Sequence, residues 1–256
     1  MFAPERQRRI LDDLKREGRA TVTELAQRYG VSEHTIRRDL HHLEQHGQLR
    51  KTHGGAVALD TAHLNFHDRT HSVPHAKDRI GRAAASLIQP GQTLVIDAGS
   101  TTLAFARHLT HRPLTIITNS LDIAREFDSD TNVHLIVTGG TWNAASRAFH
   151  GAAAQLVLSR YRADWTILGT CALHPTAGAT VTHDSDATMK QAMIDAAQRT
   201  MILADHTKRE RVVAHVVIPA TKLHTVVTDE PWPALHHLGV TVVTPTDEPT
   251  EHAAHP

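Results

Sequence analysis

The hydrophobic pattern changes character along the chain. Up to about residue 57, apolar residues recur at helical spacing, as in Ile36, Leu40 and Leu43, which stand at positions i, i+4 and i+7. After residue 77, short apolar runs typical of buried strands alternate with helical stretches. The pattern predicts two domains, at residues 1–57 and 77–245, with a linker at 58–76 and a polar, proline-rich disordered tail at 246–256.

Start and stop signals predict three helices in the first domain. Thr21 and Glu24 form a capping-box pattern that opens the second helix, and Gly30 suits the left-handed residue after its end. After a three-residue turn, Gly30-Val31-Ser32, the third helix begins, and Ser32 is a good N-cap for it. The arrangement is a helix-turn-helix. Residues 49–57 then have the pattern of a wing, with a glycine turn between two short strands.

The outward face of the third helix is polar and basic. Arg37 and Arg38 stand beside small polar groups, and an arginine can pair with guanine O6 and N7 in the major groove. Asp39 is expected to be structural and to pair with a neighbouring arginine instead of facing DNA. The residues predicted to read base edges are Glu33, His34, Thr35, Arg37 and Arg38. The other predicted DNA-binding residues are Thr21, Ser32, Arg50, Lys51 and His53, of which Thr21, Arg50, Lys51 and His53 are expected along the phosphate backbone of the DNA.

Charge and composition agree with this interpretation. The whole chain has zero formal net charge, yet residues 1–55 hold eleven Lys and Arg against eight Asp and Glu. The single cysteine, Cys171, excludes an intrachain disulfide. No apolar run approaches the ~20 residues of a membrane span, and the charged N-terminus lacks the apolar core of a signal peptide. We therefore expect a soluble cytoplasmic protein.

The 22 histidines are scattered and form no metal-ligand pattern. His42 and His46 have i, i+4 spacing, but no third ligand stands at a suggestive distance in the sequence. We expect no metal and no cofactor. The linker is polar and rich in histidine, and Pro74 is expected to break any helix there.

The second domain has the alternation of a parallel sheet covered by helices on both faces. Strands are predicted at residues 93–96, 114–118, 133–138, 165–168, 201–204, 212–218, 225–228 and 240–243. Helices are predicted at residues 77–88, 101–109, 121–127, 151–160, 186–198 and 233–238. In such sheets, ligands bind at the carboxyl ends of the strands, near helix N-termini.

Polar residues follow the first strand of this domain. Asp97 comes directly after it, Gly99 allows a tight turn, and Ser100, Thr101 and Thr102 offer hydroxyls at a helix N-terminus, where an anion is favoured. The segment has neither the Walker pattern nor a full G-x-G-x-x-G, so a small phosphate fits it better than ATP or a dinucleotide.

Other predicted strand ends carry polar groups as well. Thr118 and Asn119 follow the second strand, Gly139 and Gly140 the third, and Lys190 lies on a helix after a polar loop at residues 180–185. Together they suit a polyol and its phosphate, although Thr118 to Ser120 could be a helix cap and Lys190 a surface lysine. The predicted effector-binding set is Asp97, Gly99, Ser100, Thr101, Thr102, Thr118, Asn119, Gly139, Gly140, Lys190, Asp205 and Lys208.

Both halves resemble one known family. The segments that carry the resemblance in the first half are Thr23-Glu-Leu-Ala, Thr35-Ile-Arg-Arg-Asp-Leu and His53-Gly-Gly-Ala. In the second half they are Asp97–Thr102, Thr118–Leu121, Gly139-Gly140, Gly169, Lys190 and Asp205–Lys208. These segments resemble the DeoR family of bacterial transcription regulators. The resemblance implies a winged helix-turn-helix, a sensor domain similar in fold to ribose-5-phosphate isomerase, and a phosphorylated sugar as effector.

The sequence departs from the family pattern at Thr170-Cys171-Ala172 after Gly169, and at Asp186, where the family often has glutamate. An alternative function is a sugar-phosphate isomerase with an appended DNA-binding domain. Such an enzyme needs a carboxylate base, and four are available in principle: Asp97, Asp184, Asp186 and Asp205. The acidic position that the isomerase-like fold tends to use after Gly169 is absent. A purely architectural DNA-binding protein would need no polar cluster at strand ends.

We therefore expect a sequence-specific regulator, and not an enzyme, that represses a carbohydrate-metabolism operon and is controlled by a phosphorylated sugar. Its partners are operator DNA, that effector and a second copy of the chain in a dimer or tetramer, because helix-turn-helix operators usually carry repeats that match a protein dimer.

Overall fold

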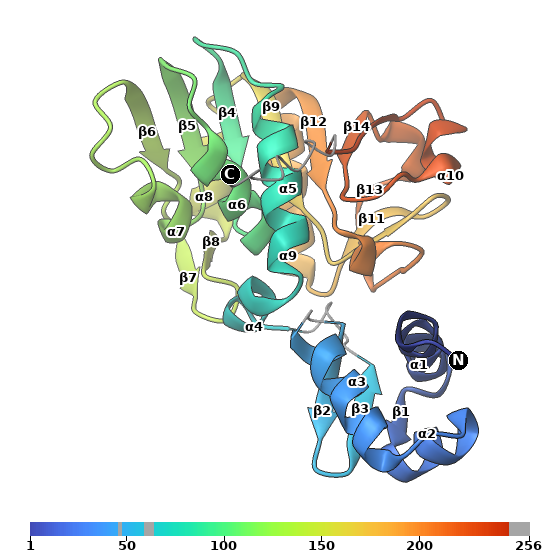
Figure 1. Cartoon of the computed structure of the whole chain (residues 1–256). Helices are drawn as coiled ribbons and strands as arrows, with labels where there is room; N and C mark the ends of the chain where they lie inside the picture. Colours follow the sequence, from blue (N-terminus) through green and yellow to red (C-terminus); the bar gives the residue numbers. More distant parts are fainter. Residues whose placement is uncertain (46–47, 59–63, 246–256) are drawn as a thin grey trace, which may run out of the picture. The chain divides into compact units, whose positions relative to one another are not determined.

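A computed structural model describes residues 1–45, 48–58 and 64–245. The chain forms two compact units, Met1–Pro74 and His75–Pro256 (Figure 1), and each is considered by itself. The boundary between them lies inside the predicted linker. Among the described residues, no helix is both long enough and apolar enough to span a bilayer.

The first unit is a helix-turn-helix with a wing. Its helices are α1 (Ala3–Glu17), α2 (Val22–Tyr29), α3 (Glu33–Gln45) and α4 (Phe66–His71), and its strands are β1 (Arg19–Thr21), β2 (Leu49–Thr52) and β3 (Gly55–Ala58). The strands form an antiparallel sheet in the order β1-β3-β2. The three predicted helices and the strand-turn-strand wing are confirmed.

Local signals account for the helix ends. The Thr21 hydroxyl accepts a hydrogen bond from the Glu24 N–H at 3.2 Å, and the Glu24 carboxylate accepts one from the Thr21 N–H at 2.8 Å, which is a complete capping box. Gly30 ends α2 in the left-handed conformation, with φ 63°. The Ser32 hydroxyl accepts from the Thr35 N–H at 3.2 Å at the start of α3.

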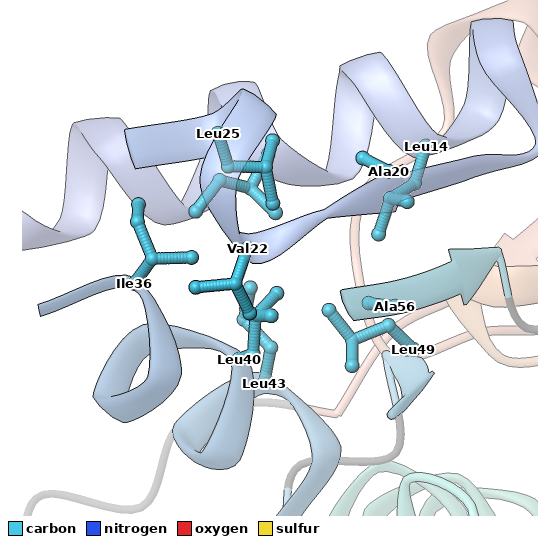
Figure 2. Packing of buried hydrophobic residues seen from close by; sticks show 10 residues of the cluster. Leu14, Ala20, Val22, Leu25, Ile36, Leu40, Leu43, Leu49 and Ala56 are labelled. Atoms are coloured by element: carbon cyan, nitrogen blue, oxygen red, sulfur yellow. The ribbon is translucent and has the colours of Figure 1, made fainter. Parts of the chain in front are cut away.

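One hydrophobic core joins α1, α2, α3 and the wing of this unit. Figure 2 shows Leu14 of α1, Leu25 of α2, and Ile36 and Leu40 of α3 packed together with Leu49 of the wing. All five are almost completely buried. Because the apolar stripe of α3 faces this core, its polar face is fixed outward.

The first strand of this sheet, β1, was not predicted, and a close backbone approach accounts for its pairing. Thr21 lies opposite Gly55, where a Cβ atom on the glycine would stand 2.1 Å from the Ala20 carbonyl oxygen. Only glycine fits that position without a shift of the backbone.

The linker prediction was partly wrong. Residues 66–71 form α4, whose N-cap Asn65 accepts from the Asp68 N–H at 3.0 Å. Pro74 does not break a helix but begins α5 (Pro74–Ala85), which was predicted to start at residue 77. Proline suits the first turn, where its missing N–H costs no hydrogen bond. Residues 59–63 of the linker and the tail at 246–256 lie outside the described part of the chain.

The second unit contains the predicted parallel sheet. Its seven strands lie in the order β15-β14-β12-β9-β4-β5-β6, and every neighbouring pair is parallel. Their bounds are β4 (Thr93–Ile96), β5 (Leu114–Thr118), β6 (Val133–Val137), β9 (Ala163–Gly169), β12 (Ala197–Leu203), β14 (Thr225–Val227) and β15 (Thr241–Val243). Residues 165–168 of β9 are all buried, so helices and loops cover both faces of the sheet there.

Shorter elements surround this sheet. The helices are α6 (Ser100–His108), α7 (Leu121–Arg125), α8 (Ala152–Leu158), α9 (Asp184–Asp195) and α10 (Pro233–His236), with 3-10 turns η1 (His206–Lys208) and η2 (Ala220–Lys222). A hairpin joins β7 (Thr141–Asn143) and β8 (Ala148–His150). A second sheet contains β10 (Ala172–His174), β11 (Gly178–Val181) and β13 (His215–Ile218).

Three predictions for this unit need correction. Residues 215–218 of the strand predicted at 212–218 pair antiparallel with β11 in the small sheet and do not join the parallel one. The loop predicted at 180–185 begins as strand, because Thr180 is buried and its hydroxyl accepts from the Val213 N–H at 3.0 Å. The helix predicted at 186–198 ends at Asp195, and β12 begins at Ala197.

Candidate functional site

The outward face of α3 is open to solvent. His34, Arg37 and Arg38 are exposed, and Glu33 and Thr35 are half-buried. Arg37 donates to the Glu33 carboxylate at 2.8 Å, and Glu33 in turn accepts from the Thr23 hydroxyl at 2.8 Å. The described residues include no side-chain partner for Arg38. This face therefore offers two arginines, one held by a carboxylate and one unpaired.

Asp39 lies on the opposite side of α3 and is buried. Its carboxylate accepts from the Arg6 guanidinium at 2.6 Å and from the Gln7 amide at 2.9 Å, both on α1. Asp39 therefore pairs with an arginine instead of facing outward, as predicted, but that arginine is Arg6 on another helix and not a neighbour in the sequence. The contact fastens α1 to α3 and leaves the outward face of α3 free.

The predicted backbone-contact residues are spread over the wing and the helix starts. Lys51 is half-buried near Glu44, with 3.8 Å between the ammonium and the carboxylate, and His53 is exposed at the turn. Arg50 stands on β2 opposite Val57, and its side chain is outside the described part. Thr21 and Ser32 use their hydroxyls as helix caps, so they offer a phosphate chiefly their position at a helix N-terminus.

The second group of predicted residues lies where the strand order of the parallel sheet reverses. Numbered along the chain, β4 is the first strand, and its neighbours β5 and β9 lead to the two halves of the sheet. Asp97 follows β4, and the Gly169 N–H at the end of β9 donates to the Asp97 carboxylate at 3.2 Å. Ligands of doubly wound sheets bind at this kind of position.

A buried ion cluster occupies this position. The Lys190 ammonium of α9 contacts the Asp97 carboxylate and lies 3.3 Å from a carboxylate oxygen of Asp186. Lys190 is 3% exposed and Asp97 1% exposed, so the alternative of a surface lysine is wrong. Burial alone would lower the pKa of Lys190, but the two carboxylates outweigh burial and raise that pKa. The lysine is therefore a buried cation.

Asn119 connects the loops around this cluster. Its amide oxygen accepts from the Ala98 N–H at 3.0 Å, and its amide nitrogen donates to the Phe149 carbonyl at 3.2 Å. Thr118 donates to the Ile96 carbonyl at 2.7 Å, and Ser120 caps α7. Hydrogen bonds to the backbone thus explain the presence of Thr118 and Ser120 without a ligand. Asn119, in contrast, links the segments that follow β4 and β5 to β8.

The loop after β4 leads into the N-terminus of α6. Gly99 is the N-cap and has no side chain with which to satisfy the first N–H groups of the helix. The Thr102 hydroxyl donates to the Gly99 carbonyl at 3.0 Å, and Thr101 and Thr102 are buried while Ser100 is half-buried. The first turn of α6 therefore combines a positive dipole end with backbone donors and two further hydroxyls.

Backbone geometry by itself accounts for Gly139 and Gly140. Their φ angles are 61° and 109°, and a Cβ atom on Gly140 would stand 2.6 Å from the His150 carbonyl oxygen. These glycines shape the turn between β6 and the β7–β8 hairpin. They are required there whether or not a ligand contacts them.

Asp205 and Lys208 follow β12, the neighbour of β9, at the same edge of the sheet. One Asp205 carboxylate oxygen accepts from the Thr207 N–H at 3.0 Å. The other oxygen is buried and has no partner among the described residues. Lys208 is buried as well. A contact joins Asp97 and Lys190 directly, Asn119 bonds the backbone of Ala98 beside Asp97, and the topology adds Asp205 and Lys208 to the same edge.

Sequence reasoning missed one residue of interest, His150. It lies on β8 next to Phe149, the residue that pairs with Asn119, and it is 9% exposed. Its Nε2 contacts the Ser146 hydroxyl at 3.2 Å, while its Nδ1 is buried without a partner among the described residues. Nothing in the sequence distinguishes this histidine from the 21 others.

Two other features have the outline of a ligand site. A hollow lined by Gly91, Pro113, Thr115, Asn132 and His134 lies at the amino ends of β5 and β6, away from the ion cluster, and has no buried charged side chain in its wall.

His206, Asp229 and Glu230 lie close enough to share a metal ion. However, His206 Nδ1 already bonds Asp229 at 2.6 Å and Arg209 pairs with Glu230 at 3.3 Å. Their charges are satisfied by protein groups.

Comparison with known families settles the class of protein. The family described as "DeoR-like helix-turn-helix domain" matches residues 6–62, and the family described as "DeoR C terminal sensor domain" matches residues 72–230. The chain belongs to the DeoR family. It is a DNA-binding transcription regulator whose second domain is the family's sensor domain.

Curated DeoR-type relatives match over most of their length. The chain is 32% identical to the L-fucose operon activator of Haemophilus influenzae, covering 88% of this chain and 91% of that protein. It is 32% identical to the HTH-type transcriptional repressor GlcR of Bacillus subtilis, over 90% and 89%. It is 31% identical to the glycerol-3-phosphate regulon repressor of Escherichia coli, over 91% and 93%.

Solved structures match the fold more distantly. A ribose 5-phosphate isomerase from Methanocaldococcus jannaschii is 16% identical with a TM-score of 0.40, covering 54% of this chain and 55% of that one. The eIF2B beta structure from Chaetomium thermophilum is 17% identical with a TM-score of 0.41, covering 56% and 41%.

Proposed function

We propose that this DeoR-family protein represses a carbohydrate-metabolism operon and that a phosphorylated sugar, bound at the strand ends of the sensor domain, controls it. The names of its relatives support this proposal, since they regulate fucose and glycerol-3-phosphate genes. Both activators and repressors occur among them, so the direction of regulation is part of the proposal.

The observation that carries the proposed effector site is the set of buried polar groups around the strand-order switch. A buried Lys–Asp pair is costly to desolvate and adds little stability compared with an apolar pair. Its presence at the position where doubly wound sheets bind ligands is therefore better explained by ligand recognition. The first turn of α6 suits a phosphate, and the unpartnered oxygen of Asp205 and Nδ1 of His150 suit sugar hydroxyls.

The proposed DNA contacts follow from exposure. His34, Arg37 and Arg38 on α3 are open to solvent and suited to base edges in the major groove. Lys51 and His53 on the wing suit the phosphate backbone. In a dimer or tetramer, two α3 helices would contact two half-sites. The effector would favour an arrangement in which their spacing no longer matches the operator.

Isomerase activity is the second candidate, and the site argues against it. The Asp97 carboxylate, which follows β4, is bound by Lys190 and by the Gly169 N–H, so it is not a free base. No acidic residue follows Gly169, where Thr170, Cys171 and Ala172 stand. Asp205 has one free oxygen, which makes Asp205→Asn the variant to compare if turnover is found.

The test is a ligand panel applied to the purified full-length protein. Thermal unfolding is recorded with pentose, hexose and triose phosphates, with the matching unphosphorylated sugars, and with inorganic phosphate. At 100 times its dissociation constant, a true effector stabilises the protein by about 2.7 kcal/mol. We expect at least one sugar phosphate to raise Tm and its unphosphorylated form not to. If no panel member does so, the effector proposal fails, and isomerisation of any panel member would favour the enzyme.

A further inference from the structure

Glu33 connects the two helices of the helix-turn-helix. It stands in the first turn of α3, and one carboxylate oxygen accepts from the Thr23 hydroxyl of α2 at 2.8 Å. The other oxygen accepts from the Arg37 guanidinium at 2.8 Å, one helical turn further along α3. Both oxygens are thus engaged within the protein.

The neighbouring arginine has no such contact. Arg38 is exposed, and the described part of the chain provides no partner for its side chain. Arg37 is 62% exposed in its side chain yet is held at Glu33. The two adjacent arginines therefore differ in conformational freedom, although either could reach a DNA base or phosphate by length alone.

The Glu33–Arg37 pair does little for stability. Exposed ion pairs at i, i+4 contribute about 0.3–0.5 kcal/mol. What the pair changes is the direction in which the guanidinium points, because an arginine otherwise has several free torsions to fix on binding. Thr23 fixes the carboxylate in turn, so the orientation is set by α2 as well as α3.

We propose that Glu33 is a positioning residue for sequence recognition. It orients Arg37 toward one base and does not read a base itself, since each of its oxygens already bonds a side chain, Thr23 on one and Arg37 on the other. Its negative charge also opposes binding of phosphates in a wrong register, which lowers the affinity for unrelated DNA. This inference rests on the proposed DNA contacts of α3 and replaces the expectation that Glu33 reads a base edge.

The experiment uses full-length protein and a randomised duplex library. Selection with the wild type defines a preferred site, and each base pair of that site is then substituted in turn. Affinities for the site, for its substituted forms and for an unrelated duplex are measured for wild type, Glu33→Gln, Thr23→Val, Arg37→Ala and the double variant Glu33→Gln/Arg37→Ala.

Glu5→Gln is the matched control. Glu5 forms an i, i+4 pair with Arg9 on α1 at 2.8 Å, its side chain is 44% exposed against 42% for Glu33, and it lies outside the predicted interface. The Glu5→Gln substitution removes the same charge and leaves the contact of Arg37 intact, so it measures the general effect of charge on DNA affinity.

We expect Glu33→Gln to bind unrelated DNA severalfold more tightly and to lower the ratio of specific to non-specific affinity by about tenfold, with the loss at the base pair that Arg37→Ala also affects. Thr23→Val keeps the charge, so it should lower the ratio without raising non-specific affinity. In the double variant, Glu33→Gln should add no further loss at that base pair.

Three results would overturn the inference. The first is an unchanged ratio in Glu33→Gln, and the second is a loss no larger than in Glu5→Gln. The third is a loss at a base pair different from the one that Arg37 affects, which would mean that Glu33 reads a base directly. If the wild type selects no site at all, the proposed DNA contacts fail instead. Circular dichroism of each variant confirms that it is folded.

Discussion

The two candidate sites of this protein treat charge in opposite ways. On α3, Arg37 and Arg38 are both exposed, and Arg37 is paired with a carboxylate that is itself partly open to solvent. At the strand ends of the sensor domain, Lys190 and Asp97 are almost completely buried and bound to each other. A surface that binds a polyanion displaces the counterions of that polyanion, so its own cationic side chains must be accessible to solvent. A pocket for a small metabolite works with few groups fixed in a dry environment.

In this protein, stability and DNA recognition are therefore expected to depend on different residues. Substitutions on α3 should change DNA affinity and leave folding nearly intact, because exposed charges contribute little to it. Substitutions in the ion cluster should mainly lower the free energy of unfolding, because a buried charge without its partner is costly.

The largest effect is expected for Lys190→Met. It leaves the Asp97 carboxylate buried without its cation and should lower the free energy of unfolding by about 3–5 kcal/mol. Urea unfolding of the full chain, monitored in the sensor domain, measures it. The double variant Lys190→Met/Asp97→Asn should recover much of the loss. A loss below about 1 kcal/mol in the single variant would mean that the pair is not buried in solution.

The next effect is expected for Arg37→Ala. Loss of a base contact should weaken specific operator binding by about 1–3 kcal/mol, with little change in Tm because the side chain is exposed. Gel shift with the selected operator and thermal unfolding measure the two quantities. Arg9→Ala, on an exposed face of α1, is the control and should retain operator affinity. Equal operator affinity in the two variants would mean that Arg37 does not contact the DNA.

A smaller effect is expected for Thr21→Val. It removes the hydroxyl that accepts from the Glu24 N–H and should destabilise the first unit by about 1 kcal/mol. Unfolding monitored in that unit tests the value, with Thr52→Val on the wing as control. If operator affinity falls while stability does not, the Thr21 hydroxyl contacts phosphate instead of serving mainly as a cap.

The smallest effect concerns pH. The hydrogen bond that the His206 imidazole donates to the Asp229 carboxylate raises the pKa of His206 above 6.5. This contact therefore stabilises the protein below that pH, and its contribution is lost as pH rises through the raised pKa. From about pH 6 to about pH 9, wild type should lose more unfolding free energy than His206→Gln. Asp229 does not reverse this sign: burial raises its pKa, but His206 outweighs burial and lowers it, so its contribution is lost only in acid. Parallel curves for the two proteins would contradict the assignment.

Local sequence signals predicted much of the fold. Thr21, Glu24, Gly30 and Ser32 act within one turn of the chain, so their roles as caps could be inferred without knowing the tertiary structure. The principal strands of the parallel sheet were recognisable because strands buried on both faces are continuous apolar runs. The three-residue strands β1, β7 and β8 are too short to show a period.

The candidate sites were less predictable because their contacts are long-range. Asp97 was singled out from its position after a strand, but its partner Lys190 is 93 residues away, and burial of that lysine depends on the packing of α9. The Thr23–Glu33 contact likewise depends on the angle between α2 and α3. His150 has a buried, unpartnered nitrogen only because β8 pairs with β7 and packs inward.

The regulation proposed for this protein is that a ligand at the strand ends of the sensor domain controls DNA binding by α3. Its most direct test is fluorescence anisotropy of the labelled operator bound to the full-length protein, titrated with the phosphorylated sugar that raises Tm most. We predict release of the operator, with at least a fivefold loss of affinity, corresponding to a coupling free energy of about 1 kcal/mol or more. Unchanged operator affinity at saturating ligand would contradict the claim.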